Sequence, residues 1–202
     1  GTGVLGWLLF PMGIAGYLSE GPLTILLGTG AVSAVLLRRS VPLTALPRTN
    51  GVGKVLLAVL CLVLVFDLLE GLAPPADADS LAYHFDIPRR FAEAGRVDFI
   101  YEALNGAVPL LVQISYLPAF QLGGEMALTL WTMISGWGAG ALLFVLCRNF
   151  LGFNWSLAVT VIFLTTPAVI YGGGSGLVEA RLAMFVMVAA WATARAVQSP
   201  RI

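Results

Sequence analysis

Charged side chains are scarce in this chain. Lysine and arginine together number 11, aspartate and glutamate also number 11, and the formal net charge of the 202 residues is zero. Proteins that bind DNA or RNA need a basic surface to neutralise phosphates, and the sequence has no basic cluster of that kind. We therefore expect no nucleic-acid partner.

Histidine and cysteine are scarcer still. His84 is the only histidine, and the two cysteines, Cys61 and Cys147, each lie inside an apolar run. Neither cysteine has a paired or metal-ligand spacing, so the sequence indicates no disulfide and no zinc site.

Apolar residues are abundant. They make up 58% of the chain, and the mean hydropathy is +0.90. These values exclude an ordinary soluble domain and predict an all-α polytopic membrane protein. The six predicted transmembrane helices are the apolar runs 4–18, 22–37, 55–72, 126–146, 155–171 and 177–197.

Basic residues predict the orientation. The loop 38–54 contains no acid and carries Arg38, Arg39, Arg48 and Lys54. The positive-inside rule places it in the cytoplasm, so both chain ends are cytoplasmic and the large loop 73–124 lies outside. Within that loop, the apolar run 107–122 is expected to be a re-entrant or interfacial helix. The chain then divides into a helical hairpin with its basic loop, 1–52, and a transmembrane module, 53–202.

One polar stretch stands apart from these apolar runs, and it reaches from Asp77 to Asp98. It holds nine ionisable side chains in 22 residues. Asp79 or Ser80 is expected to cap a helix that Pro88 breaks or restarts and that Gly95 ends. At helical spacing one stripe contains Asp79, Tyr83, Asp86, Arg90 and Glu93, which predicts an amphipathic helix at the outer membrane surface. The alternative is a solvated polar face without chemistry.

A second outer feature begins at the glycine-rich segment 172–176, which is expected to be a flexible turn. Glu179 and Arg181 follow it at the start of an apolar run. Ionisable groups in such a position are costly unless they are paired or functional. We expect them to face the same outer cavity as Asp79, and the alternative is a local ion pair or an anchor at headgroup depth.

Two segments carry a family resemblance. The first runs from Asp79 through Pro88 to Arg96, directly after a long apolar run, and the second joins Thr166-Pro167 to residues 176–185. Their order and placement resemble the GT-C glycosyltransferases, specifically bacterial relatives of the dolichyl-phosphate-mannose protein mannosyltransferases and the aminoarabinose transferases. The likeness implies a GT-C-like fold. Family members are usually longer, so it also implies that this chain covers their amino-terminal catalytic part.

The resemblance further implies an inverting transfer of sugar from a polyprenyl-phosphate donor to an acceptor, on the outer face of a bacterial inner membrane. Asp79 is then the general base on the acceptor. The leaving phosphate needs a cation, for which Arg90 is the first candidate. Glu179 falls on the family's second acidic position, where relatives often have Asp, and this leaves open whether it binds substrate or a divalent metal. The predicted substrate-binding residues are Asp77, Tyr83, His84, Arg89, Arg90, Arg96, Glu179 and Arg181.

Other interpretations stay open. A transporter or flippase for a lipid-linked or anionic solute would place ionisable groups and broken helices near the bilayer midplane, whereas the acids here cluster at predicted outer helix ends. A non-catalytic assembly subunit would use the outer helix to dock a partner, and Asp79→Asn would leave its function intact. Tyr83 could equally be an interfacial anchor and His84 a satisfied hydrogen-bonding group.

Overall fold

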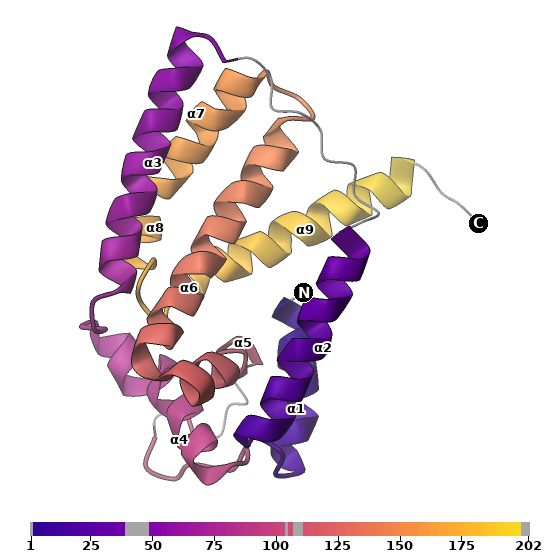
Figure 1. Cartoon of the computed structure of the whole chain (residues 1–202), viewed down its shortest axis with the longest axis vertical. Coiled ribbons are helices and arrows are strands. Elements are labelled where there is room, and N and C mark those ends of the chain that lie inside the picture. Colours follow the sequence, from indigo (N-terminus) through magenta and orange to yellow (C-terminus); the bar gives the residue numbers. More distant parts are fainter. Residues whose placement is uncertain (1, 39–48, 104, 107–110, 199–202) are drawn as a thin grey trace. The chain divides into compact units, whose positions relative to one another are not determined.

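The computed structural model describes residues 2–38, 49–103, 105–106 and 111–198, and this part of the chain is helical without any strand. The helices, labelled in Figure 1, are α1 (Thr2–Ile14), α2 (Glu20–Arg38), α3 (Gly51–Gly71), a π-helical turn η1 (Ser80–His84), α4 (Asp86–Ala94), α5 (Leu111–Ile114), α6 (Leu117–Cys147), α7 (Phe153–Leu164), α8 (Pro167–Tyr171) and α9 (Glu179–Gln198). The expectation of an all-α protein is confirmed.

The chain divides into two compact units. The first unit joins Gly1–Arg48 to Pro74–Trp131, and the second joins Thr49–Ala73 to Thr132–Ile202. Most of the predicted basic loop lies outside the described residues, including Arg39 and Arg48, and so does the side chain of Arg38.

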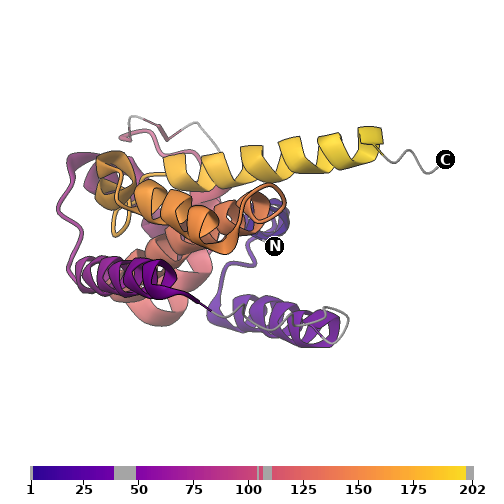
Figure 2. The same ribbon diagram turned by 90° about the horizontal axis from the view of Figure 1, so that it is seen from above.

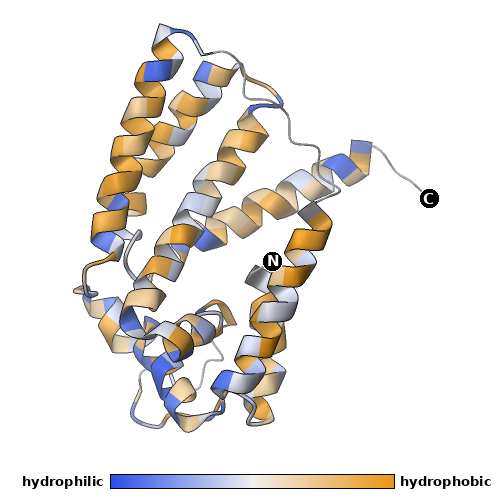
Figure 3. Ribbon diagram, viewed as in Figure 1, coloured by the Kyte–Doolittle hydropathy of each residue, from blue (hydrophilic) through white to orange (hydrophobic). Residues whose placement is uncertain are grey.

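Four of the described helices are long and apolar enough to cross a membrane: α2 from Glu20 to Leu37, α3, α6 and α9. On α2 and α3 the large apolar side chains are mostly exposed, and hydrophobic colour covers most of the α3 ribbon (Figure 3). Lipid suits such a surface better than water does. The other two predicted spans fall on α1 and α7, which have 13 and 12 residues. At about 1.5 Å per residue these reach about 20 Å, short of a hydrocarbon core of about 30 Å, so the count of six spans stays a prediction.

The expectation of one continuous helix over 155–171 was wrong. Helix α7 ends at Leu164, and Thr166 has extended backbone angles, φ −66° and ψ 129°, before α8 begins at Pro167. A residue that precedes proline is sterically disfavoured in the helical conformation, so the Thr166-Pro167 pair interrupts the helix.

Helix α6 also contains a break, at Gly124, whose φ of 66° and ψ of −158° lie outside the helical region. Glycine adopts such angles without the steric cost that a Cβ would add. The segment after the break corresponds to the predicted span 126–146. Of the predicted re-entrant helix 107–122, residues 107–110 lie outside the described residues, and the rest forms the short α5 and the start of α6.

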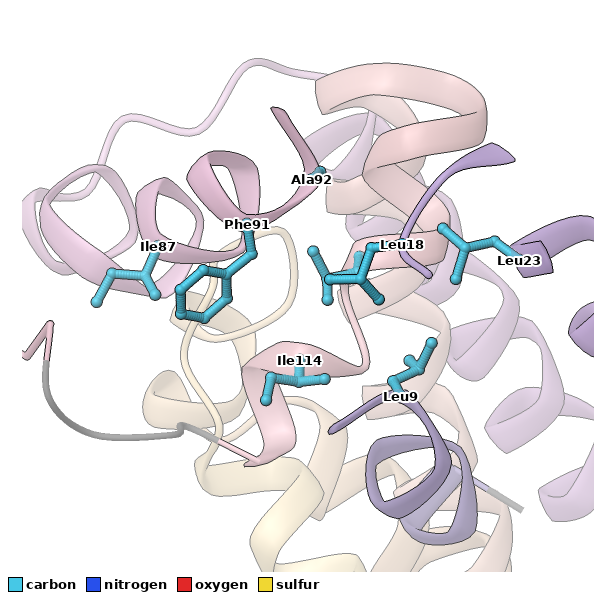
Figure 4. Close-up of a cluster of buried hydrophobic side chains, with 8 residues drawn as sticks. Leu9, Leu18, Leu23, Ile87, Phe91, Ala92 and Ile114 are labelled. Carbon is cyan, nitrogen blue, oxygen red and sulfur yellow. The ribbon is translucent and has the colours of Figure 1, made fainter. Parts of the chain in front are cut away.

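An apolar cluster organises the first unit and fixes the position of α4. Figure 4 shows Ile87, Phe91 and Ala92 of α4 lying toward Leu9, Leu18 and Leu23 of the α1–α2 hairpin and toward Ile114 of α5. The core side chains are 5% exposed or less. Helix α4 therefore buries one face in the unit, and its charged residues lie on the other face.

In the second unit, α3 packs along α7, and the two lie side by side in both Figure 1 and Figure 2. Asn50 joins their ends, because its Oδ1 accepts hydrogen bonds from the Gly53 N–H (3.0 Å) and from Asn154 Nδ2 (2.8 Å). The first of these bonds caps the start of α3, and the second ties that cap to α7.

Candidate functional site

The polar stretch after α3 begins with a capped π-helical turn. The Oδ1 of Asp77 accepts a hydrogen bond from the Ser80 N–H at 2.8 Å. Asp79 makes no capping hydrogen bond, and its side chain is exposed. The prediction that Asp79 or Ser80 forms the cap was therefore wrong: Asp77 has the structural role, because its carboxylate lies three residues before the Ser80 N–H and accepts a hydrogen bond from it. This leaves the Asp79 carboxylate facing solvent.

The π-helical turn also changes the register of the side chains that follow it. Its closing hydrogen bond runs from the Phe85 N–H to the Ser80 carbonyl, five residues apart, at 2.9 Å. A π turn contains one more residue than an α turn. The predicted stripe assumed α-helical spacing from Asp79 to Glu93, so its two halves do not line up as expected. The ending of α4 at Gly95 is confirmed, with a left-handed φ of 68°.

His84 lies inside the first unit. It is 4% exposed, and its Nδ1 is 2.8 Å from the Nε2 of Gln113 on α5. Since the amide nitrogen donates, Nδ1 accepts this bond. The Tyr83 ring is stacked at a tilt, with its centroid 4.1 Å from that of His84. The hydrogen bond agrees with the alternative reading of His84 as a satisfied polar group.

A charged cluster covers the face of α4 that is opposite its buried apolar face, in the region of dense blue in Figure 3. The Asp86 carboxylate, 12% exposed, accepts a hydrogen bond from Arg89 Nη2 at 2.8 Å and another from Arg90 Nε at 2.7 Å. Arg89 also lies 4.0 Å from Glu93 and 3.7 Å from Glu125, which follows the break in α6. Arg89 thus links α4 to the start of the long part of α6.

A small pocket of about 40 Å³ lies beside this cluster. Its walls are Pro75, Leu81, Phe85, Asp86, Arg89, Phe120, Glu125 and Leu128. Arg89 is part of the wall, whereas Arg90 is not. Asp79 lies between Pro75 and Leu81 in the sequence, and both of these residues line the pocket.

Glu125 was not among the predicted site residues, because it is an isolated acid in an apolar region. The signal that could have found it is the preceding Gly123-Gly124 pair, since a glycine break before an apolar run gives the next residue a distinct position at the start of a helix. Arg96, by contrast, lies apart from the pocket walls, and its Nη2 pairs with Asp98 Oδ2 at 2.5 Å.

The second unit holds the other predicted site residues. Glu179 is exposed in the first turn of α9, and Arg181 is 3% exposed. The glycine-rich segment that was expected to be a flexible turn is packed: Ser175 is 5% exposed, and a methyl group at Gly174 would lie 3.2 Å from the Glu70 carbonyl oxygen. Because these residues and Asp79 belong to different units, the expectation of a shared cavity stays a prediction.

A buried carboxylate near the end of α3 completes the second unit. Asp67 is 8% exposed and accepts a hydrogen bond from Trp137 Nε1 at 3.1 Å. Among the described residues, no group of three or more histidine, cysteine, aspartate or glutamate side chains is placed to hold a metal ion. Comparisons with protein-family models, curated proteins and solved structures gave no match to this chain.

Proposed function

We propose that this chain carries the outer-face site of a membrane glycosyltransferase that moves a sugar from a polyprenyl-phosphate donor to an acceptor. One observation carries the proposal: an ordered polar segment directly after α3 combines an exposed carboxylate, Asp79, with a walled pocket and an arginine, Arg89. The first of the two segments that resemble the GT-C enzymes lies here, from Asp79 to Arg96. Helix α3 is long and apolar enough to deliver the segment to a membrane surface.

In the proposed reaction, the acceptor oxygen or nitrogen forms a bond to the anomeric carbon while the bond from that carbon to the phosphate oxygen breaks. The Asp79 carboxylate takes the proton that the acceptor loses. Its exposure leaves it available for this role, since the capping bond comes from Asp77. The polyprenyl phosphate leaves with the electron pair and an additional negative charge.

An arginine stabilises that charge in the proposed mechanism. Arg89 and Arg90 both bind Asp86, but only Arg89 lines the pocket. This placement favours Arg89 over Arg90, the first choice from the sequence. Arg96 is a weaker candidate because Asp98 pairs with it.

Transport of a lipid-linked solute is the second candidate, and buried ionisable groups favour it. Asp67 and Arg181 lie inside helices long enough to span a membrane, and breaks interrupt the apolar segments at Gly124 and Thr166. However, Asp67 is only four residues from the last residue of α3, Gly71. At about 1.5 Å per residue that is about 6 Å from the helix end, away from the midplane position that transporters favour.

The experiment reconstitutes the purified chain in liposomes with a sugar-loaded polyprenyl phosphate and measures release of the free polyprenyl phosphate. We expect Asp79→Asn to lower the rate by about 10² to 10⁴-fold, because it removes the general base. Glu102→Gln is the matched control, since Glu102 is another exposed acid of the same loop. Equal rates for the two variants would contradict the role of Asp79, and movement of intact sugar lipid across the bilayer would favour the transporter.

A further inference from the structure

The pocket beside Arg89 has an excess of negative charge. Three carboxylates, of Asp86, Glu93 and Glu125, meet two guanidinium groups, of Arg89 and Arg90, in one connected cluster. The sum of these formal charges, three negative and two positive, is −1. The pocket itself shows the same balance, because Asp86 and Glu125 line it together with Arg89 alone.

The carboxylates of this cluster differ in how many hydrogen bonds they accept and in how exposed they are. Asp86 accepts two hydrogen bonds shorter than 3 Å and is 12% exposed. Glu125 lies 3.7 Å from Arg89 and is 62% exposed. A distance of 3.7 Å is an ion-pair contact but too long for a hydrogen bond. Glu125 therefore presents carboxylate oxygens that can accept further hydrogen bonds at the pocket wall.

The rest of the wall is apolar and partly aromatic, with Phe85 and Phe120 among the lining residues. An ammonium group suits this combination, because it donates hydrogen bonds to a carboxylate and is attracted to the faces of aromatic rings. Inside the pocket a phosphate group is less favourable, because two carboxylates in the same small wall would repel it. In the proposed reaction the leaving phosphate therefore meets the exposed side of Arg89, a side chain that is 43% exposed, and not the pocket interior. A volume of about 40 Å³ exceeds the roughly 10–15 Å³ that a single water needs and is too small for a sugar ring.

We propose that this pocket binds the ammonium group of an amine-bearing ligand, with Glu125 as its main partner. This deepens the proposed function and rests on it in one respect: the amine-bearing ligand is then the sugar acceptor, anchored by its ammonium group beside the loop that carries Asp79. Arg89 has a positioning role here. It keeps Asp86 and Glu125 at one wall by contacting both carboxylates.

The test is a ligand-observed NMR titration of the full chain in nanodiscs with two probes of equal length, n-butylammonium and n-butyl phosphate. We expect n-butylammonium to bind more tightly. Glu125→Gln should weaken its binding about fivefold, which corresponds to about 1 kcal/mol for one exposed ion pair. Glu102→Gln is the control, because Glu102 does not line the pocket, and it should leave binding unchanged.

Tighter binding of n-butyl phosphate, or unchanged n-butylammonium binding in Glu125→Gln, would overturn the proposal. Its failure is distinguishable from failure of the proposed function, because binding is measured without turnover. Asp79→Asn should retain n-butylammonium binding while losing transfer. Ammonium binding in a chain that transfers no sugar would preserve the pocket assignment and remove the acceptor role.

Discussion

Charged side chains on α4 of the first unit and two charged side chains of the second unit lie in opposite surroundings. In the first unit, Arg89 and Arg90 are 43% and 45% exposed and share the carboxylate of Asp86. In the second unit, Asp67 is 8% exposed and Arg181 is 3% exposed, inside helices that are mostly apolar. The charges on α4 of the first unit lie over a hydrophobic core, whereas Asp67 and Arg181 of the second unit are buried.

This difference decides which substitutions can report on function. An exposed ion pair contributes little to stability, typically about 0 to 1 kcal/mol, so a large loss of activity on its removal points to chemistry. Removal of one partner from a buried polar pair leaves the other unsatisfied and destabilises the fold. Loss of activity in the second unit therefore needs a stability measurement beside it, and the first unit is the better place to test catalysis.

The largest expected effect concerns the core beneath the charged face of α4. Phe91→Ala should lower the free energy of unfolding by about 3–5 kcal/mol, because Phe91 is 2% exposed and its removal leaves a cavity. Unfolding in mixed detergent micelles, followed by circular dichroism, measures this. Phe99→Ala is the control, since Phe99 is 50% exposed. Similar effects of the two changes would contradict the role of the apolar core in holding α4 in place.

An intermediate effect is expected at the buried carboxylate of the second unit. Asp67→Leu should lower the free energy of unfolding by about 1–3 kcal/mol, because the Trp137 N–H loses its acceptor in a buried position. Asp67→Asn retains an acceptor oxygen and should cost less.

A double-mutant cycle sharpens this result. Asp67→Leu combined with Trp137→Phe removes donor and acceptor together, so the pair should be less destabilised than the sum of the single changes predicts. Strict additivity, measured by the same unfolding assay, would show that the hydrogen bond between the two side chains contributes nothing and would remove the contrast with the first unit.

Features with local causes could be predicted from the sequence. The expected spans 55–72 and 177–197 correspond to Gly51–Gly71 and Glu179–Gln198, because long apolar runs favour helices whatever surrounds them. Gly95 was predicted to end its helix for a similarly local reason, since glycine adopts the left-handed conformation readily. Neither feature depends on distant parts of the chain.

Features that depend on tertiary packing or on a single turn could not be predicted. Glu125 lies 36 positions after Arg89 in the sequence. No pattern in either segment indicates that the two side chains come together. The π-helical turn at Ser80–His84 inserts one residue and shifts the helical register. The prediction used α-helical spacing throughout and so did not include this shift. The break before Pro167 has a local cause, because a residue that precedes proline disfavours the helical conformation. The expectation of one helix over 155–171 followed the apolar run and did not take this proline into account.

The smallest stability effect is expected for Arg90, and it separates two functional assignments. Arg90→Gln should change the free energy of unfolding by about 0 to 1 kcal/mol, because the pair is partly exposed and Asp86 keeps its bond to Arg89. Since the fold is then intact, the transfer assay reports function directly.

A large loss of transfer in Arg90→Gln would support the assignment from the sequence, in which Arg90 stabilises the leaving phosphate. Unchanged transfer in Arg90→Gln, with loss in Arg89→Gln, would support the arginine that lines the pocket. Arg148→Gln is the control for both, because Arg148 is an exposed arginine of the second unit that donates a hydrogen bond to the Leu151 carbonyl.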